Sequence, residues 1–121
     1  MEIICTKLAK GDVLISLDVI AKAAGIVASG CYGVVGMAYR SKKDEIANLL
    51  KKDSLTKGIK VYCEEDKLAI DMHIIVDYGV NINAVSTNVM SNVKYHITNI
   101  TGMEVSKVDV FVEGFRLQNK E

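Results

Sequence analysis

A polar turn between two runs of alternating apolar and polar residues constrains this chain more than any other feature. Alternation runs over residues 59–63, stops at the polar tetrapeptide 64–67, and resumes over residues 68–78. A period of two predicts β-strands with one buried face, and a polar turn between two such strands predicts a β-hairpin. We expect the buried face of this hairpin to carry Ile59, Val61, Cys63, Leu68, Ile70, Met72, Ile74, Val76 and Tyr78.

Two segments carry apolar residues at helical spacing. Residues 17–29 are almost entirely apolar, which predicts a helix buried on all sides, with Ser16 as its N-cap. Residues 83–99 combine one apolar stripe with an opposite polar face, and Thr101-Gly102 is expected to end this second helix. The stripe consists of Ile82, Val85, Val89, Val93, Ile97 and Ile100.

The remaining regular segments complete an α/β (α+β) architecture. They are strands at residues 12–16, 34–39 and 108–112, the last ending at Gly114, and a short amphipathic helix within residues 40–57. The predicted order, β-α-β-(α)-β-β-α-β, favours a mixed sheet with the two long helices packed on it. Because the sequence has no repeat or linker, we expect one domain over residues 1–121 with its core at residues 8–115.

Composition excludes several classes of protein. The 121 residues are 50% hydrophobic and contain 15 basic and 15 acidic side chains, so the formal net charge is zero. Disordered chains combine low hydrophobicity with high net charge, and nucleic-acid-binding domains are typically basic, so neither class is expected. The first apolar stretch, residues 13–20, is shorter than the ~20 apolar residues that cross a bilayer, so we expect no membrane span. Three widely spaced cysteines, an odd number, favour a reducing cytoplasm.

Few residues are suited to chemistry, and none is expected to be catalytic. The three cysteines and two histidines show no metal-ligand spacing, so no metal or cofactor is expected. His73 shares a predicted strand face with Asp71 and Asp77, which fits either a small enzyme or ligand site or a solvated polar face. The glycine spacings of residues 25–30 and 33–36 match a phosphate loop and a KH-domain loop, but the flanking residues fit neither.

Two surfaces are candidates for binding partners. The outer face of the predicted helix 83–99 is almost uncharged, which is typical of interfaces and also of ordinary polar faces. Its candidate residues are Asn88, Ser91, Asn92 and Tyr95. Residues 40–60 carry seven basic side chains against three acidic ones, which suits a complementary protein, a second copy or, as an alternative, a nucleic acid. The candidate residues of this basic segment are Lys42, Lys43, Lys51 and Lys52.

Several runs of the sequence resemble one protein family. They are GDVLIS at residues 11–16, YGVVGM at 32–37, AIDMHIIVDYGVNI at 69–82 and ITGMEV at 100–105. Together they resemble the alkaline shock protein family, also called the envelope stress response family of Gram-positive bacteria. The resemblance covers roughly residues 8–115 and is closest to the short housekeeping-type members.

The resemblance implies a non-enzymatic protein with no catalytic residue and no cofactor. It also implies a cytoplasmic location, self-association and, as in some members, attachment to the inner face of the cell membrane through a small membrane-protein partner. We therefore expect a scaffold or adaptor linked to cell-envelope homeostasis or stress response, acting through protein–protein contacts. The alternative is a small nucleic-acid-binding module that uses residues 40–60, although nucleic acid is not the expected partner.

Overall fold

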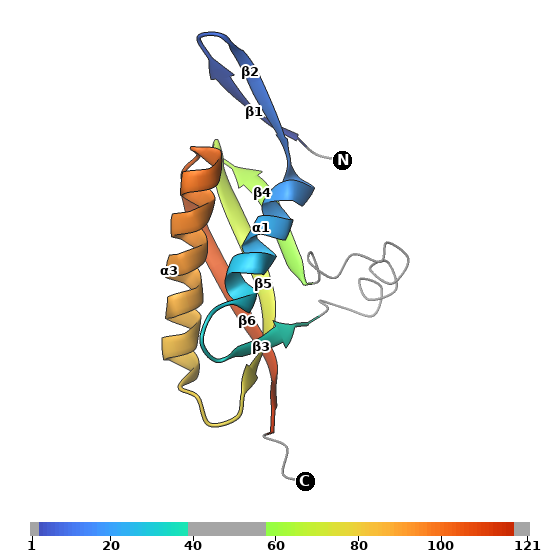
Figure 1. Ribbon diagram of the computed structural model, residues 1–121, viewed down its shortest axis with the longest axis vertical. Helices are drawn as coiled ribbons and strands as arrows, with labels where there is room; N and C mark the ends of the chain where they lie inside the picture. Colours follow the sequence, from blue (N-terminus) through green and yellow to red (C-terminus); the bar gives the residue numbers. More distant parts are fainter. Residues whose placement is uncertain (1–2, 39–57, 118–121) are drawn as a thin grey trace, which may run out of the picture.

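The computed structural model describes residues 3–38 and 58–117 of the chain, and these residues form two β-sheets and two helices (Figure 1). The predicted α+β class is confirmed. In chain order the elements are β1 (Ile3–Leu8), β2 (Gly11–Ser16), α1 (Leu17–Ser29), β3 (Val34–Met37), β4 (Ile59–Glu64), β5 (Lys67–Asp77), α3 (Ile82–Thr101) and β6 (Val105–Arg116).

Strand β5 forms the centre of the larger sheet. Strand β6 runs parallel to it along nearly its whole length, from the pair Leu68–Val105 to the pair Asp77–Arg116. Strands β4 and β3 both pair antiparallel with β5, β4 with residues 67–72 and β3 with residues 74–76. Since β6 occupies one edge of β5, β4 and β3 follow one another along the other edge. The sheet is therefore mixed, as predicted, and β6 extends past the expected end at Gly114 to residue 116.

The two strands on the shared edge meet at His73. The backbone N–H of Ala38 donates to the carbonyl of His73 at 2.9 Å, and the N–H of His73 donates to the carbonyl of Gly58 at 3.0 Å. Gly58 has a φ of +69°, and a Cβ placed on it would lie 1.9 Å from the carbonyl oxygen of Ala38. The chain thus leaves and rejoins the sheet at one point. The amphipathic helix predicted within residues 40–57 lies outside the described residues.

Helix α1 begins and ends where the sequence predicts. The hydroxyl of Ser16 accepts a hydrogen bond from the backbone N–H of Asp18 at 3.1 Å, so Ser16 is the N-cap. The prediction that this helix is buried on all sides is wrong. Its inner side packs on the sheet and on α3, but Val19 and Ile26 on its outer side are exposed because no described element covers them.

Helix α3 lies beside α1 on the same face of the larger sheet (Figure 1). Four members of the predicted stripe are buried, namely Val85, Val89, Val93 and Ile97. Ile82 and Ile100 are exposed instead, because one begins the helix and the other lies in its last turn. The left-handed conformation of Gly102, with a φ of +74°, ends the helix as predicted.

The β4–β5 hairpin follows the predicted alternation. Glu65 and Asp66 form its two-residue loop and both have positive φ, as the tight turns between twisted strands require. Two members of the predicted buried face are exposed. Cys63 lies one residue from the end of edge strand β4, and Tyr78 follows the last residue of β5, so both lie at sheet margins. The largest fully buried side chains are Ile20, Leu68, Ile70, Met72, Ile74, Val76, Val89, Val93, Ile97 and Val105.

The smaller sheet consists of β1 and β2 alone. The sequence predicts β2 but not β1, whose residues show no clear alternation. The two strands pair antiparallel over residues 3–16 and extend beyond one end of the helix layer (Figure 1). The first predicted strand therefore belongs to a separate hairpin and not to the sheet that the helices cover, which corrects the predicted strand order.

Candidate functional site

The outer face of α3 carries the four residues predicted to form an interaction surface. Because Val85, Val89 and Val93 point into the core, the residues on the opposite side of the helix point outward. Asn88, Ser91 and Tyr95 are exposed and Asn92 is partly buried. The structure thus places the four residues on one side of α3, but their side chains have different neighbours.

Asn88 and Asn92 line a hollow between α1 and α3. The side-chain amide of Asn92 donates to the side-chain oxygen of Asn88 at 3.2 Å and contacts the Sγ of Cys31 at 3.5 Å. Cys31 is anchored in turn by its thiol, which lies 3.4 Å from the carbonyl of Val27. The hollow has a volume of about 370 Å³ and is lined by Ile26, Val27, Gly30, Cys31, Tyr32, Asn88, Asn92 and His96.

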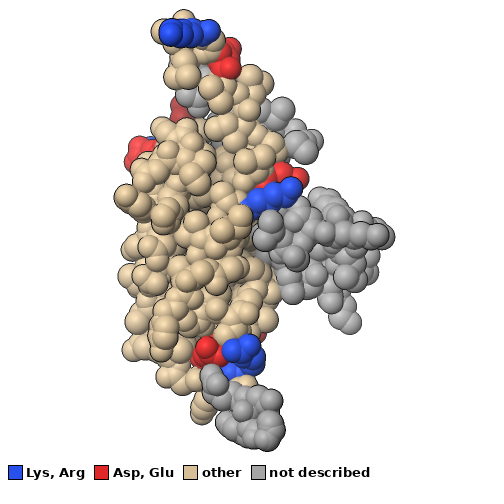
Figure 2. Space-filling view, viewed as in Figure 1, with Lys and Arg blue, Asp and Glu red and all other residues tan. Residues whose placement is uncertain are grey.

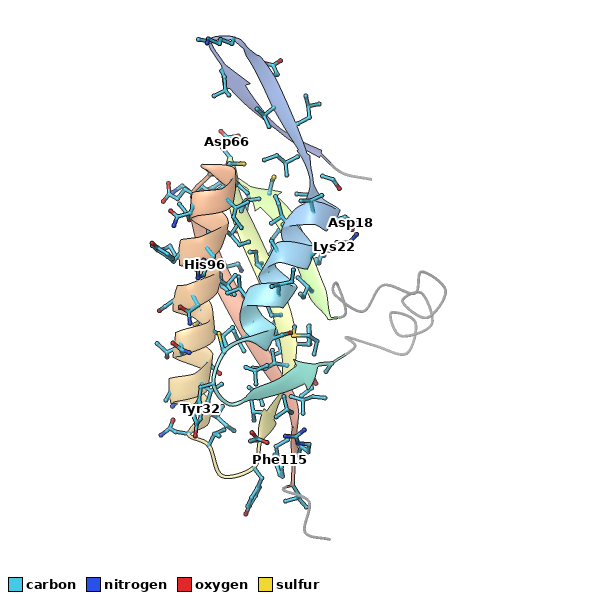
Figure 3. The ribbon with its side chains drawn as sticks, in the orientation of Figure 1. Asp18, Lys22, Tyr32, Asp66, His96 and Phe115 are labelled. Carbon is cyan, nitrogen blue, oxygen red and sulfur yellow. The ribbon has the colours of Figure 1, made fainter. Side chains whose placement is uncertain are left out.

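The sequence did not identify the α1 side of this hollow. Tyr32 follows α1 and is 81% exposed, and Ile26 is exposed one turn before the end of that helix. Figure 3 shows His96 in the upper half of α3 and Tyr32 below the end of α1, near the first turns of α3. His96 follows Asn92 by one turn of α3, whereas only the packing of α1 beside α3 brings Ile26 and Tyr32 next to the asparagines. This hollow and its rim are called the helix-layer hollow below.

Ser91 lines a second hollow, next to β6 instead of α1. This hollow of about 310 Å³ lies between α3 and β6 and is lined by Met90, Ser91, Lys94, Lys107 and Val108. Hydrogen bonding with Asp109, and next with Tyr62, raises the pKa of the Lys107 amine above its ordinary value. Tyr95 lines neither hollow and makes an edge-to-face contact with the ring of His96, with centroids 5.2 Å apart.

The face of the larger sheet away from the helices carries the third candidate group. The imidazole of His73 contacts the carboxylate of Glu113 at 2.6 Å through Nδ1 and stacks on Phe111, with ring centroids 4.6 Å apart. Asp77 pairs with Arg116 at 3.1 Å. Hence the carboxylate in contact with His73 is Glu113 on β6, and not Asp71 or Asp77, the two carboxylates that share its strand face.

Asp71 lies on the same face without joining that group. Its Oδ1 is buried and has no hydrogen-bond partner among residues 3–38 and 58–117. Within residues 3–38 and 58–117, no three His, Cys, Asp or Glu side chains are grouped so that they could hold a metal ion. The open face of the sheet is therefore a row of separate pairs and not a converging site.

The basic candidates Lys42, Lys43, Lys51 and Lys52 lie outside the described residues. The described residues on either side of this segment, Ala38 and Gly58, hydrogen-bond to the backbone of His73. They do so on the edge of β5 opposite β6. No helix in the described part of the chain is long and apolar enough to cross a membrane.

Comparison with known proteins gives the family. Residues 6–117 match the profile of the alkaline shock protein 23 family, which is described as having a cell envelope-related function. The chain belongs to this family. The resemblance found in the sequence is confirmed, and a function related to the cell envelope follows from family membership.

Two relatives match this chain over nearly the full length of both proteins. The chain is 41% identical over 110 residues to the uncharacterized protein YloU of Bacillus subtilis, covering 90% of this chain and 92% of that protein. It is 35% identical over 108 residues to the uncharacterized protein Spy1614 of Streptococcus pyogenes, covering 88% and 89%. No solved structure matches the chain.

Proposed function

We propose that this chain is a non-enzymatic adaptor or scaffold of the cell envelope that acts by binding protein partners, including copies of itself. Membership of a family with a cell envelope-related function supports the cellular context. The remaining support comes from the surface of the helix layer.

The observation that carries the proposal is an uncharged, partly apolar helix layer that nothing in the described structure covers. Figure 2 shows this face as an almost continuous uncharged surface, with charged side chains at its margins. Val19, Ile26, Tyr32 and Tyr95 expose large apolar side chains there. Depletion of charge together with exposed aromatic side chains is typical of the central part of protein interfaces.

The helix-layer hollow gives this surface its specificity. Asn88 and Asn92 line the hollow with amide donors and acceptors, while Ile26 and Tyr32 line it with exposed apolar side chains. A partner that places an apolar side chain between the helices and a hydrogen-bonding group over the asparagines would satisfy both. A membrane-anchored protein that presents such a segment on the cytoplasmic side would bring the chain to the inner face of the membrane.

The open sheet face supports an enzyme less well. His73 is held by Glu113 and Phe111, and Asp77 by Arg116, so these side chains already stabilise the β5–β6 pair. Neither the family match nor the described residues support the nucleic-acid alternative, whose basic side chains lie largely in residues 39–57.

A pair of double variants on α3 tests the proposal. Asn88→Lys with Asn92→Lys places two charges in the helix-layer hollow, and Asn83→Lys with Thr87→Lys makes the same change at exposed positions of the same helix. Tagged chains are used to capture partners from detergent-solubilised membranes of the native host. We expect the first variant to lose the captured proteins and the second to retain them.

Circular dichroism melting of both variants separates loss of binding from loss of folding. Capture of the same proteins by both variants would show that the helix-layer hollow is not the binding site. Failure of the native chain to capture anything would count against the adaptor function itself.

A further inference from the structure

Strand β6 forms an edge of the larger sheet over twelve residues. It pairs with β5 on one side, and none of the described residues pairs with its other side. An open edge of this length presents a row of backbone N–H and C=O groups that can pair with a further strand. Such an edge is a binding surface in its own right.

The surroundings of this edge suit an added strand. The hollow lined by Met90, Ser91, Lys94, Lys107 and Val108 lies where α3 passes beside β6. Val110 and Val112 continue the same side of the strand and are only partly buried. A strand added at the edge would place its own apolar side chains beside these valines and over the hollow.

The sequence of β6 complements itself in one antiparallel register. When two copies pair with their two-fold axis at Val110, Val108 of each copy lies opposite Val112 of the other. In the same register Lys107 of each copy lies opposite Glu113 of the other. The pairing of β6 with β5 is irregular at Glu113, but its carboxylate still contacts His73 on the open face, so two oppositely charged pairs form there.

The neighbouring registers that keep both helix layers on one side of the sheet are less favourable. An axis at Phe111 sets Asp109 opposite Glu113, which places like charges together. An axis at Asp109 sets Lys107 opposite Phe111, which leaves the amine without a carboxylate across the junction. In the single chain Lys107 pairs with Asp109 at 3.3 Å and Glu113 with His73 at 2.6 Å. The two side chains are still 45% and 43% exposed, so both are accessible to a second copy.

We propose that two copies of this chain join by antiparallel pairing of β6 with β6 about Val110, which makes one continuous sheet through both copies. This inference rests on the self-association in the proposed function and names the surface responsible. It leaves the helix-layer hollow of each copy available to other proteins, because that hollow lies between α3 and α1 and not next to β6.

Charge reversal tests the register. Lys107→Glu alone and Glu113→Lys alone each turn both charge pairs into repulsions, so each should weaken dimerisation by roughly tenfold or more. The double variant restores opposite charges and should recover most of the affinity. Sedimentation equilibrium over a concentration series measures the dimerisation constant of all three variants, and thermal melting confirms that each variant is folded.

The ion pair between Lys67 and Glu104 provides the matched control. The Nζ of Lys67 and the Oε2 of Glu104 lie 3.5 Å apart at the start of β5, away from the centre of the β6 edge. The side chain of Lys67 is as exposed as that of Lys107. Lys67→Glu and Glu104→Lys should leave dimerisation unchanged. A second test is Val110→Cys, which should give a disulfide between identical positions of two copies under mild oxidation, identified as a linked peptide by mass spectrometry.

Three results would overturn the inference. A native chain that remains monomeric at every concentration excludes the pairing, while the capture experiment on α3 still decides the adaptor function. A dimer that is insensitive to Lys107→Glu places the interface elsewhere. A monomer that captures a foreign protein through Lys107 and Glu113 shows that the edge binds a strand of another protein.

Discussion

The two sheets of this chain have similar apolar strands but very different surroundings. In the larger sheet, β5 has strands on both edges and helices over one face, and Leu68 is 0% exposed. In the smaller sheet, β2 pairs only with β1, and Leu14 is 63% exposed. A two-stranded hairpin has too few neighbours to bury its side chains or to be stable alone. Position in the fold, and not composition, therefore decides which leucine contributes to the core.

The largest expected effect comes from a charge in the core of the larger sheet. Val89→Asp buries an unpaired carboxylate beneath α3, so we expect a loss above about 4 kcal/mol from a total stability of roughly 5–15 kcal/mol. Urea denaturation followed by circular dichroism measures it. Ser91→Asp, two residues along the same helix, is the control and should change stability by less than ~0.5 kcal/mol. Equal losses would mean that the inward face of α3 is misassigned.

The next effect concerns the junction of β3 and β4. Gly58→Ala places a side chain at a positive φ and against the carbonyl of Ala38, so we expect a loss of about 2 kcal/mol or more. Gly36→Ala is the control because nothing lies within 4 Å of its Cβ position. Denaturant unfolding compares the two, and amide exchange at Ala38 and His73 should rise only in the Gly58 variant. A neutral Gly58→Ala would show that the two edge strands do not meet as described.

A smaller effect is expected where the hairpin joins the body. Ser16 is the last residue of β2 and the N-cap of α1, so Ser16→Ala should cost about 1 kcal/mol. Ser29→Ala at the opposite end of α1 removes an exposed hydroxyl and should be close to neutral. Thermal melting of the two variants measures the difference. Similar melting temperatures would indicate that the cap does not stabilise the helix.

The smallest effect is expected in the hairpin itself. Leu14→Ala removes an exposed side chain and should change global stability by less than ~0.5 kcal/mol, whereas Leu68→Ala should cost about 2–5 kcal/mol. Hydrogen exchange should also show faster opening of residues 3–16 than of β5 in the native chain. A large loss from Leu14→Ala would mean that the hairpin is covered in solution, for instance by another molecule.

Local patterns predicted local structure well. The cap at Ser16, the stop at Gly102 and the β4–β5 hairpin all depend on residues within a few positions of each other, and the structure confirms them. The predictions of burial were wrong where the exposure of a side chain depends on whether another element packs over it. Val19 and Tyr78 follow the apolar patterns of α1 and β5, but no element in the described part of the chain covers them.

Contacts between distant segments were not predictable from the sequence. The parallel pairing of β5 with β6 brings Glu113 to His73 across 40 positions, and no spacing in the sequence indicates that register. In the same way, Asn88 and Asn92 were predicted as surface residues, but their position beside Tyr32 depends on how α1 packs against α3. The binding surfaces of this chain are products of tertiary packing.

The attachment of residues 39–57 at the backbone of His73 has a consequence for variation within the family. Because Ala38 and Gly58 bond to the same residue of β5, the sheet on either side is held in register whatever the length of chain between them. A flexible insertion between fixed ends costs little free energy, since each doubling of the length of a flexible loop adds only about 0.6 kcal/mol. Variants with flexible residues inserted at this position should therefore keep the register of the larger sheet.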